Sequence, residues 1–474
     1  MKQNGHLYLE QEILVKDALK VLNKELNLQP VTETEILKVL YRLVMQDSIV
    51  VEENRVYITQ QHQEEEDTAS MIARKLHERI PVLTIEKELE EAQEDLNITL
   101  SEQQKEAVRM VFANPISIIT GGPGTGKTTV LKIILYIYQK KCGNEVKLMA
   151  PTGRAARRMA ESTGSGDATT MHMALGLFGD GDYEALIDEL SADFINVDEV
   201  SMVDMHLAYE FFYKVKAGAR VLLVGDVHQL PSVGAGDVFR QLILCGKIPV
   251  TVLNLVYRQG KDSNIPINAQ LINEGKTNLQ WGDDFQMVEC SGADAAAQIV
   301  KNIYLKEIQM YGMEQVQILS PYKVRSAAGV LELNRSLQDE VNPPVSGKRE
   351  LHLGGEIFRE GDRILQNKNT EFASNGDLGT LVQIAEDEDN NPLVQIVFTD
   401  GRRVKYEAEQ VEMIEHANAI TIHKSQGSEC QVVIIPWLKA FYPMLKRNIF
   451  YTGITRAKPV SYTHLRAHET LRHL

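Results

Sequence analysis

Short apolar runs alternate with stretches of helical spacing through the middle of the chain. Between residues 100 and 260, four such runs each end in a polar or glycine-rich turn. The runs are Ile116–Thr120, Val146–Ala150, Phe194–Val197 and Val221–Val224. This alternation predicts an α/β unit with a parallel sheet covered by helices, and with functional loops at the carboxyl ends of the strands.

The regions on either side have other patterns. Residues 8–60 contain two segments of helical spacing and a short hairpin at Ile49–Glu52 and Arg55–Thr59. This order predicts a winged-helix-like unit, with a plain helical packing domain as the alternative. Residues 315–338 and 417–458 return to the α/β pattern, which predicts a second unit of the same class.

The segment between those two stretches, about residues 345–412, is rich in short β-type runs. They are Arg363–Gln366, Gly379–Ile384, Val394–Phe398 and Arg403–Tyr406. Turn sequences such as Asn375-Gly376-Asp377 separate them. We predict a small β-barrel inserted into the second α/β unit.

Composition sets limits on these assignments. The 474 residues allow about three domains, and 43% hydrophobic with 24% charged residues is typical of a globular protein. No stretch approaches the ~18 apolar residues of a membrane span, and the first residues show no secretory signal. The four cysteines are far apart in the sequence, so we expect no disulfide framework or cysteine metal site and a cytoplasmic location.

The net charge of −15 argues against a passive nucleic-acid coat, but the acid is unevenly distributed. Residues 1–100 carry −9, and the other 374 residues carry only −6. A local basic groove is therefore still allowed. The run Glu64–Asp67 begins an acidic helical linker that extends to about Leu96, and we expect its charged face to be solvated.

One segment has the pattern of a phosphate-binding loop. Residues 121–128 read GGPGTGKT, follow the run that ends at Thr120 and open a helix predicted at Thr129–Tyr138. Glycines let backbone N–H groups close around phosphates, Lys127 can reach the terminal phosphates, and Thr128 can hold Mg²⁺ through its hydroxyl. The predicted nucleotide-binding residues are Gly122, Pro123, Gly124, Thr125, Gly126, Lys127, Thr128 and Thr129.

Polar residues at other strand ends complete a candidate catalytic set. Asp198 and Glu199 follow Val197, where Asp198 would hold Mg²⁺ and Glu199 would polarise the attacking water. Gln229 follows the next strand and could sense the γ-phosphate, although Gly225-Asp226 can also be a simple turn. Arg258 and Arg456 are candidate arginine fingers, with surface ion pairs as the alternative.

Taken together, these motifs resemble the superfamily 1 helicases, and most closely the stand-alone bacterial RecD-like branch. The resemblance runs from about Gly5 to Lys458 and depends on the order of the motifs. In chain order they are LSEQQ (100–104), the phosphate loop, APTGRAA (150–156), TMH (170–172), DEVSM (198–202), GDVHQLP (225–231), YRQ (257–259), IHKSQGSE (422–429) and YTGITRAK (451–458).

The resemblance implies an α/β fold with two RecA-like motor lobes, an SH3-like barrel insert and an N-terminal winged-helix-like domain. It implies an ATP- and Mg²⁺-dependent DNA helicase that moves 5′ to 3′ on single-stranded DNA, in repair or recombination, as a monomer. Gln104 would read the adenine, and Gln229, Arg258 and Arg456 would contact the γ-phosphate. The implied DNA-binding residues are Pro151, Thr152, Gly153, Arg154, His172, His423, Lys424 and Ser425.

The expected division of the chain follows from these patterns. It is 1–95 (helical domain and acidic linker), 96–250 (first lobe), 251–344 and 413–458 (second lobe), 345–412 (barrel) and 459–474 (a non-native tail). Relative to the family, the chain is expected to be shortened at both ends. We expect no strand after Lys458, and residues 177–193 are short where the family has a strand-separating hairpin.

Several alternatives remain open at this stage. The basic segment Arg154–Arg158 could line a groove for a single strand or form a solvated helix face. The chain could be a conjugation-type helicase or an RNA helicase. It could also be a DNA-stimulated nucleotide-hydrolysing module that does not open duplexes. Tailed duplex DNA is the expected substrate of the leading hypothesis, and protein partners are not predicted.

Overall fold

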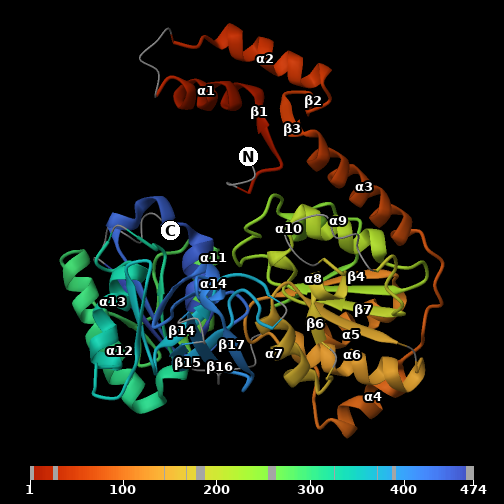
Figure 1. Ribbon diagram of the computed structural model, residues 1–474. Coiled ribbons are helices and arrows are strands. Elements are labelled where there is room, and N and C mark those ends of the chain that lie inside the picture. The colour runs from red at the N-terminus through yellow and green to blue at the C-terminus, as the bar shows by residue number, and fades with distance from the viewer. Residues whose placement is uncertain are drawn as a thin grey trace.

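The computed structural model describes residues 5–24, 30–143, 145–166, 168–177, 187–254, 263–324, 326–370, 372–386 and 391–465. Figure 1 shows two α/β lobes side by side, with an N-terminal module above them and helix α3 running down to the first lobe. Within these residues, no helix combines the length and the hydropathy that a membrane span needs.

The N-terminal module is a three-stranded antiparallel sheet with two helices. Its elements are β1 (Tyr8–Glu10), α1 (Gln11–Leu22), α2 (Glu33–Met45), β2 (Ile49–Glu52) and β3 (Arg55–Ile58). α2 begins with a capping box, in which Thr32 and Glu35 satisfy each other's backbone N–H groups. The two helices and the hairpin agree with the sequence pattern, β1 was not predicted, and the winged-helix description stays a prediction.

The acidic segment after this module packs against the first lobe. α3 (Thr59–Leu76) lies along α9 (Met205–Lys214), and α4 (Glu86–Asp95) contacts α6. Glu64 is buried, and its Oε1 lies 2.9 Å from Nδ1 of His206. The expectation that Glu64–Asp67 is a solvated run was wrong for Glu64, because the helical repeat turns it toward α9.

The first lobe, lobe 1, contains a six-stranded parallel sheet in the order β6-β5-β7-β8-β4-β9. The strands are β4 (Ile116–Gly121), β5 (Val146–Ala150), β6 (Ala168–Thr170), β7 (Phe194–Val197), β8 (Arg220–Gly225) and β9 (Val250–Leu253). The helices, besides α9, are α5 (Glu102–Ala113), α6 (Lys127–Lys141), α7 (Gly153–Thr163), α8 (Met171–Ala174), η2 (Val200–Met202) and α10 (Val238–Leu244). β4, β7 and β8 are buried at every position, which explains their continuous apolar runs.

The second lobe, lobe 2, contains a five-stranded parallel sheet in the order β10-β21-β20-β11-β19. The strands are β10 (Phe285–Met287), β11 (Val316–Ser320), β19 (Ala419–Thr421), β20 (Cys430–Trp437) and β21 (Ala457–Leu465). The helices are α11 (Asn264–Asn273), α12 (Ala293–Tyr311), η3 (Met313–Gln315), α13 (Val330–Val341), η4 (His423–Ser425), η5 (Lys439–Met444) and α15 (Arg447–Ile454).

β21 corrects the expectation for the end of the chain. The sequence pattern predicted no strand after Lys458, but β21 pairs with β20 on one side and with β10 on the other. Parallel pairing uses backbone groups, so many side chains are compatible with it. Tyr462 is buried, and its hydroxyl donates to Glu307 Oε1 at 3.1 Å. Residues 466–474 of the predicted tail lie outside the described residues.

The insert between α13 and β19 is antiparallel. It contains a hairpin, β12 (Glu350–Leu353) with β13 (Glu356–Arg359), and a sheet in the order β17-β16-β15-β14-β18. The sheet strands are β14 (Arg363–Gln366), β15 (Leu378–Glu386), β16 (Pro392–Phe398), β17 (Arg403–Tyr406) and β18 (Ile414–His416), with α14 (Ala408–Val411) between the last two. Most of its buried side chains form a core of their own, whereas Leu365 and Leu378 join the core of lobe 2.

Charged groups join this insert to lobe 1. Arg157 of α7 pairs with Asp377 and with Asp400, and both carboxylates also pair with Arg402 of the insert. Asp377 is completely buried. This cluster holds the loop before β15 against the start of α7.

Candidate active site and nucleic-acid interface

The phosphate loop lies between β4 and α6, at the carboxyl edge of the lobe 1 sheet. Gly124 and Gly126 have φ angles of +76° and +86°, in the left-handed region that favours glycine. Lys127 Nζ donates to the carbonyls of Gly121 at 2.5 Å and Gly122 at 3.1 Å, so the ammonium lies over the loop. The loop therefore has the curved form with which backbone N–H groups surround a phosphate.

Gln104 braces this loop from behind. Its Oε1 accepts from the Ser101 N–H at 3.0 Å, and its Nε2 donates to the Thr125 carbonyl at 3.2 Å. A Cβ on Gly126 would collide with the same amide. Gln104 is not among the residues that line the adjacent cavity, so the adenine-reading role predicted for it does not follow from this geometry.

The predicted acidic pair lies at the end of β7. Burial and the neighbouring charge of Glu199 raise the pKa of Asp198 to about 6. Glu199 has a φ of +53°, a strained conformation for a residue with a side chain. Two adjacent carboxylates, one of them buried, favour a cation between them and the phosphates. The strain at Glu199 is maintained at the position where the attacking water is predicted to be activated.

The loop after β8 is more than a turn. Asp226 is completely buried, and its Oδ2 accepts from the Tyr451 hydroxyl at 2.8 Å and from Gln229 Nε2 at 3.4 Å. Burial and the charge of Asp226 raise the pKa of Tyr451 well above its ordinary value. Because Tyr451 belongs to α15, this hydrogen bond joins the two lobes.

Lobe 2 provides the opposite wall with Arg456. This residue is 3% exposed, its Nε donates to the Thr452 carbonyl at 3.2 Å, and its Nη1 donates to the Ser428 carbonyl at 3.3 Å. Among the described residues, its guanidinium has no carboxylate partner. The nearby Arg158 of α7 pairs with Glu429. Arg456 thus retains an uncompensated positive charge that faces the phosphate loop.

These groups enclose a cavity of about 270 Å³, the nucleotide cavity. It is lined by Gly122, Pro123, Gly124, Thr125, Gly126, Lys127, Thr128, Thr129, Ala155, Arg158, Met159, Ser162, Asp198, Glu199, Gln229, Glu429, Thr455 and Arg456. The residues fit a nucleotide triphosphate with a divalent cation, because N–H groups and cations face the phosphate position and carboxylates face the metal position. Gln229 Oε1 is buried without a hydrogen-bond partner among the described residues, as expected beside an absent polar ligand.

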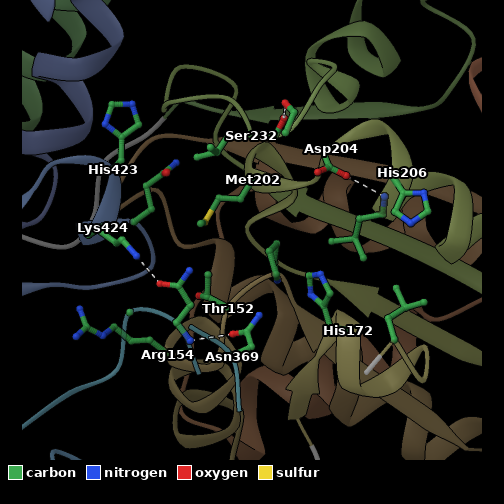
Figure 2. Close-up of a pocket in the computed structure, with 18 residues that line it drawn as sticks. Thr152, Arg154, His172, Met202, Asp204, His206, Ser232, Asn369, His423 and Lys424 are labelled. Carbon is green, nitrogen blue, oxygen red and sulfur yellow. Dashed lines mark hydrogen bonds between the residues drawn. The ribbon is translucent and has the colours of Figure 1, made fainter. Parts of the chain in front are cut away.

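A second cavity of about 680 Å³, the interlobe cavity, opens between the lobes and the insert. In Figure 2, His423 and Lys424 of lobe 2 lie across from His172 and His206 of lobe 1, with Arg154 and Asn369 below. It is lined by Pro151, Thr152, Arg154, His172, Leu177, Met202, Asp204, His206, Leu207, Ser232, Val233, Gly234, Asn369, Asn375, Gly376, His423, Lys424 and Gln426.

The titratable groups of the interlobe cavity are perturbed by burial. Burial lowers the pKa of Lys424 and lowers the pKa of Arg154 to about 10. It also lowers the pKa of His172 and of His423, although the charge of Asp204 partly offsets this for His172. Lys424 Nζ donates to Asn375 Oδ1 at 2.5 Å. Two cations and the imidazoles of His172 and His423 therefore face one space, an arrangement that suits phosphates and bases of a single strand.

Three family models match the chain. An AAA domain matches residues 99–293, a UvrD-like helicase C-terminal domain matches residues 416–462, and the SH3 domain of ATP-dependent RecD-like DNA helicases matches residues 333–398. The chain belongs to the RecD-like superfamily 1 helicases. Its lobes are the RecA-like motor of that family, and its insert is the family's SH3 domain.

Named relatives and one solved structure are similar to parts of this chain. The ATP-dependent RecD2 DNA helicase of Deinococcus radiodurans is 35% identical over 359 residues, which are 76% of this chain and 48% of the relative. RecBCD enzyme subunit RecD of Haemophilus influenzae is 28% identical over 433 residues, with 75% and 67% covered. Pif1 helicase from Candida albicans has a TM-score of 0.48 at 18% identity, with 79% and 96% covered. The chain spans about half the length of the Deinococcus relative.

In this RecD-like helicase, most but not all predicted DNA-binding residues meet in one cavity. Pro151, Thr152, Arg154, His172, His423 and Lys424 line it. Gly153 instead packs against Ser374 of the insert, where a Cβ would lie 2.5 Å from the hydroxyl oxygen. Ser425 is completely buried, and its hydroxyl donates to the Ile422 carbonyl at 2.7 Å. These two positions shape the RecD-like cavity rather than line it.

Both interpretations of the basic segment Arg154–Arg158 need correction. Arg154 lines the interlobe cavity, Arg157 binds two carboxylates of the insert, and Arg158 lines the nucleotide cavity. Arg157 and Arg158 point apart because adjacent positions on a helix do not share a face, and Arg154 lies one turn earlier, between their two directions. The segment is neither a single groove wall nor a solvated face.

Some predicted features lie outside the described residues. Arg258 lies outside them. Of the shortened hairpin region, residues 177–193, only Leu177 and residues 187–193 are described. Conversely, the structure adds Asn369 and Asn375 of the RecD-like SH3 insert, and His206, to the interlobe cavity. The turn-type sequence context of Asn369 and Asn375 gave no signal of this role, because the insert meets lobe 1 only in the folded chain, and His206 lies within α9, away from the motifs.

Proposed function

We propose that this chain hydrolyses ATP to move 5′ to 3′ along single-stranded DNA and opens tailed duplexes as it moves, in repair or recombination. The observation that carries the proposal is that the two cavities share walls. α7 lines the interlobe cavity through Arg154 and the nucleotide cavity through Arg158. In lobe 2, Gln426 lines the first cavity and Glu429 lines the second. Motion at one cavity is therefore transmitted to the other.

The proposed chemistry assigns one task to each group. Lys127 and Arg456 neutralise the terminal phosphates from opposite lobes, and Glu199 accepts the proton of the attacking water. Thr128 and Asp198 would hold Mg²⁺, which supplies further neutralisation of phosphate charge. Closure of the lobes around ATP and reopening after hydrolysis would change the interlobe cavity in each cycle. The 5′-to-3′ direction rests on the family resemblance.

The first experiment is ATP hydrolysis by the full chain with Mg²⁺, alone or with single-stranded DNA, single-stranded RNA or blunt duplex DNA. We expect strong stimulation by single-stranded DNA only, because the interlobe cavity takes one unpaired strand. Equal stimulation by RNA would favour an RNA helicase. No stimulation by any nucleic acid would contradict a coupled motor.

The second experiment measures strand separation on duplexes with a 5′ tail, a 3′ tail or no tail. We expect opening of the 5′-tailed duplex alone. Opening of the 3′-tailed duplex alone would overturn the direction. Stimulated hydrolysis without opening of any duplex would reduce the function to a translocase or a DNA-stimulated module.

The remaining expectations are part of the same proposal. We infer a cytoplasmic monomer that uses ATP and Mg²⁺, with the domain boundaries given under Sequence analysis. Support for a reducing compartment comes from the wide spacing of the four cysteines in the sequence. Sedimentation with and without a single-stranded oligonucleotide tests the monomer.

A further inference from the structure

The loop Asp226–Leu230 lies between the two cavities. Its residue Gln229 lines the nucleotide cavity. The side chain of the next residue, Leu230, lines neither cavity, but the backbone carbonyl of Leu230 accepts a hydrogen bond from Gln426 Nε2 at 3.0 Å. Gln426 lines the interlobe cavity. Gln426 at the DNA side is thus joined to Gln229 at the phosphate side by one hydrogen bond and the backbone of Leu230.

Lobe 2 holds this loop at three points. The Tyr451 hydroxyl donates to Asp226, the Thr452 hydroxyl oxygen accepts from the Leu230 N–H at 2.9 Å, and Gln426 donates to the Leu230 carbonyl. Leu230 therefore has both its backbone groups bound by lobe 2. All of these side chains are at most 5% exposed. We call Tyr451, Thr452 and Gln426 the loop clamp.

Lobe 1 holds only the beginning of the loop. The Val227 N–H donates to Thr120 Oγ1 at 3.3 Å, next to the phosphate loop. The Tyr451 hydroxyl also lies near that loop, since a Cβ on Gly122 would be 3.2 Å from it. The position of Gln229 is consequently set by both lobes. If the lobes move relative to each other, either the loop moves together with lobe 2 or the hydrogen bonds from lobe 2 to the loop break.

We propose that the loop clamp couples DNA binding to ATP hydrolysis. Thr452 and Gln426 act as positioning residues, which place Gln229 at the γ-phosphate when bound DNA fixes the position of lobe 2. This inference rests on the proposed function and adds its route of regulation. The proposed route passes through the backbone of Leu230, a residue to which the motifs assign no contact with ATP or DNA. Because Thr452 lines neither cavity, we expect it to be dispensable for binding either substrate and necessary for communication between the two sites.

Thr452 gives the sharpest test because it lines neither cavity and is completely buried. Thr452→Val keeps the shape and removes the acceptor for Leu230, and Thr452→Ser restores the hydroxyl. The matched control is Thr68→Val on α3, another buried threonine whose hydroxyl bonds to the backbone, there to the Glu64 carbonyl. Thermal unfolding of all three variants verifies that each is folded at the assay temperature.

The measurements are ATP hydrolysis with and without oligo-dT, and the affinities for oligo-dT and a non-hydrolysable ATP analogue. For Thr452→Val we expect the ratio of stimulated to basal turnover to fall about fivefold or more, with both affinities within about twofold of wild type. Thr452→Ser should recover most of the ratio, and Thr68→Val should match wild type. Gln426→Leu should lower the same ratio.

Several outcomes would overturn the inference. Full stimulation of Thr452→Val would show that the clamp carries no signal. An equal loss of basal and stimulated turnover that Thr452→Ser does not restore would show a purely structural role. Wild-type protein without DNA-stimulated hydrolysis would instead remove the proposed function, and the coupling inference with it, so the two failures are distinguishable.

Discussion

The two cavities of this RecD-like helicase are built in different ways. The longest continuous part of the wall of the nucleotide cavity is residues 122–129, and lobe 2 adds Arg456 and its neighbours. The interlobe cavity takes its wall from lobe 1, lobe 2 and the SH3 insert, in short pieces that are far apart in the sequence. The first site is therefore the more local of the two, and the second depends more on tertiary structure.

This difference has a consequence for how each site fails. A change in the phosphate loop acts directly on the reacting phosphates, so it should remove hydrolysis outright. A change in the interlobe cavity removes one of many dispersed contacts, so it should weaken DNA binding by degrees. The contacts that hold the insert in place, which are distant from both sites, should affect only the second.

Lys127→Ala should have the largest effect. Loss of the ammonium that lies over the phosphate loop should lower ATP turnover about a thousandfold or more, measured as phosphate release with single-stranded DNA. The control is Lys140→Ala on the same helix, where Lys140 pairs with Glu91 at 2.7 Å on the surface. Substantial residual turnover in Lys127→Ala would show that the phosphates of ATP bind somewhere other than this loop.

Arg456→Ala should have the second-largest effect. It measures the contribution of lobe 2 to hydrolysis separately from that of the phosphate loop in lobe 1. We expect turnover to fall about a hundredfold, because one charged donor to the phosphates is lost, while binding of an ATP analogue persists. Arg447→Ala at the start of α15 is the control, since Arg447 Nη1 donates to the Asn273 carbonyl away from the cavity. Unchanged turnover in Arg456→Ala would contradict the finger assignment.

His416 tests the attachment of the insert. It lies at the end of β18, where the chain returns to lobe 2, and its ring stacks on Phe358. Burial lowers its pKa, but hydrogen bonds to Asp362 and Glu356 outweigh this and raise the pKa to about 9. Gln338 also contacts the ring. Its charged form is thus favoured in the folded chain.

The sign of the pH effect follows from this shift. The folded pKa of about 9 is above the ordinary value of 6.5, so the stabilisation is complete below pH 6.5 and is lost as pH rises through 9. It amounts to about 3 kcal/mol at most. Urea unfolding, followed by the fluorescence of buried Trp437, should show a loss over this window that His416→Asn removes. His352→Asn, on an exposed position of β12, is the control. A parallel pH dependence in His416→Asn would refute the prediction.

Lys424→Ala should have the smallest effect and measures one contact of the dispersed site. We expect single-stranded DNA affinity to fall about tenfold or less, and the slope of log affinity against log salt to decrease by about 0.7. Lys323→Ala is the control, because Lys323 pairs with Glu415 in lobe 2 and does not line the cavity. An unchanged slope would place the DNA backbone away from Lys424.

The strands that surround the sites were largely predictable. β5, β7, β14 and β17 have the predicted bounds, and β4 and β8 differ by one residue at an end. Continuous apolar runs identify strands that are buried on both faces, and short runs between turns identify antiparallel ones. β21 was missed because its run contains polar residues, which a strand tolerates when its backbone pairs on both sides.

The residues of the candidate site also divide into those that the sequence predicted and those that it did not. Lys127, Thr128 and the acidic pair follow from motif and strand context, because a short loop cannot place its own residues far apart. For Gln104 and Arg157, the structure shows contacts that the sequence did not predict, and adenine recognition by Gln104 stays a prediction. Their partners, Thr125 for the first and Asp377 for the second, depend on how separate segments meet.

The chain's own pattern was thus sufficient for the α/β class, the phosphate loop and the order of the motifs, all of which arise from neighbours in sequence. Folding alone placed Asn375 beside Lys424, Glu64 beside His206 and Thr452 beside Leu230. Each of these pairs is separated by 49 to 222 residues. Local propensity carries no information across such separations, because only the burial of complete faces brings these segments together.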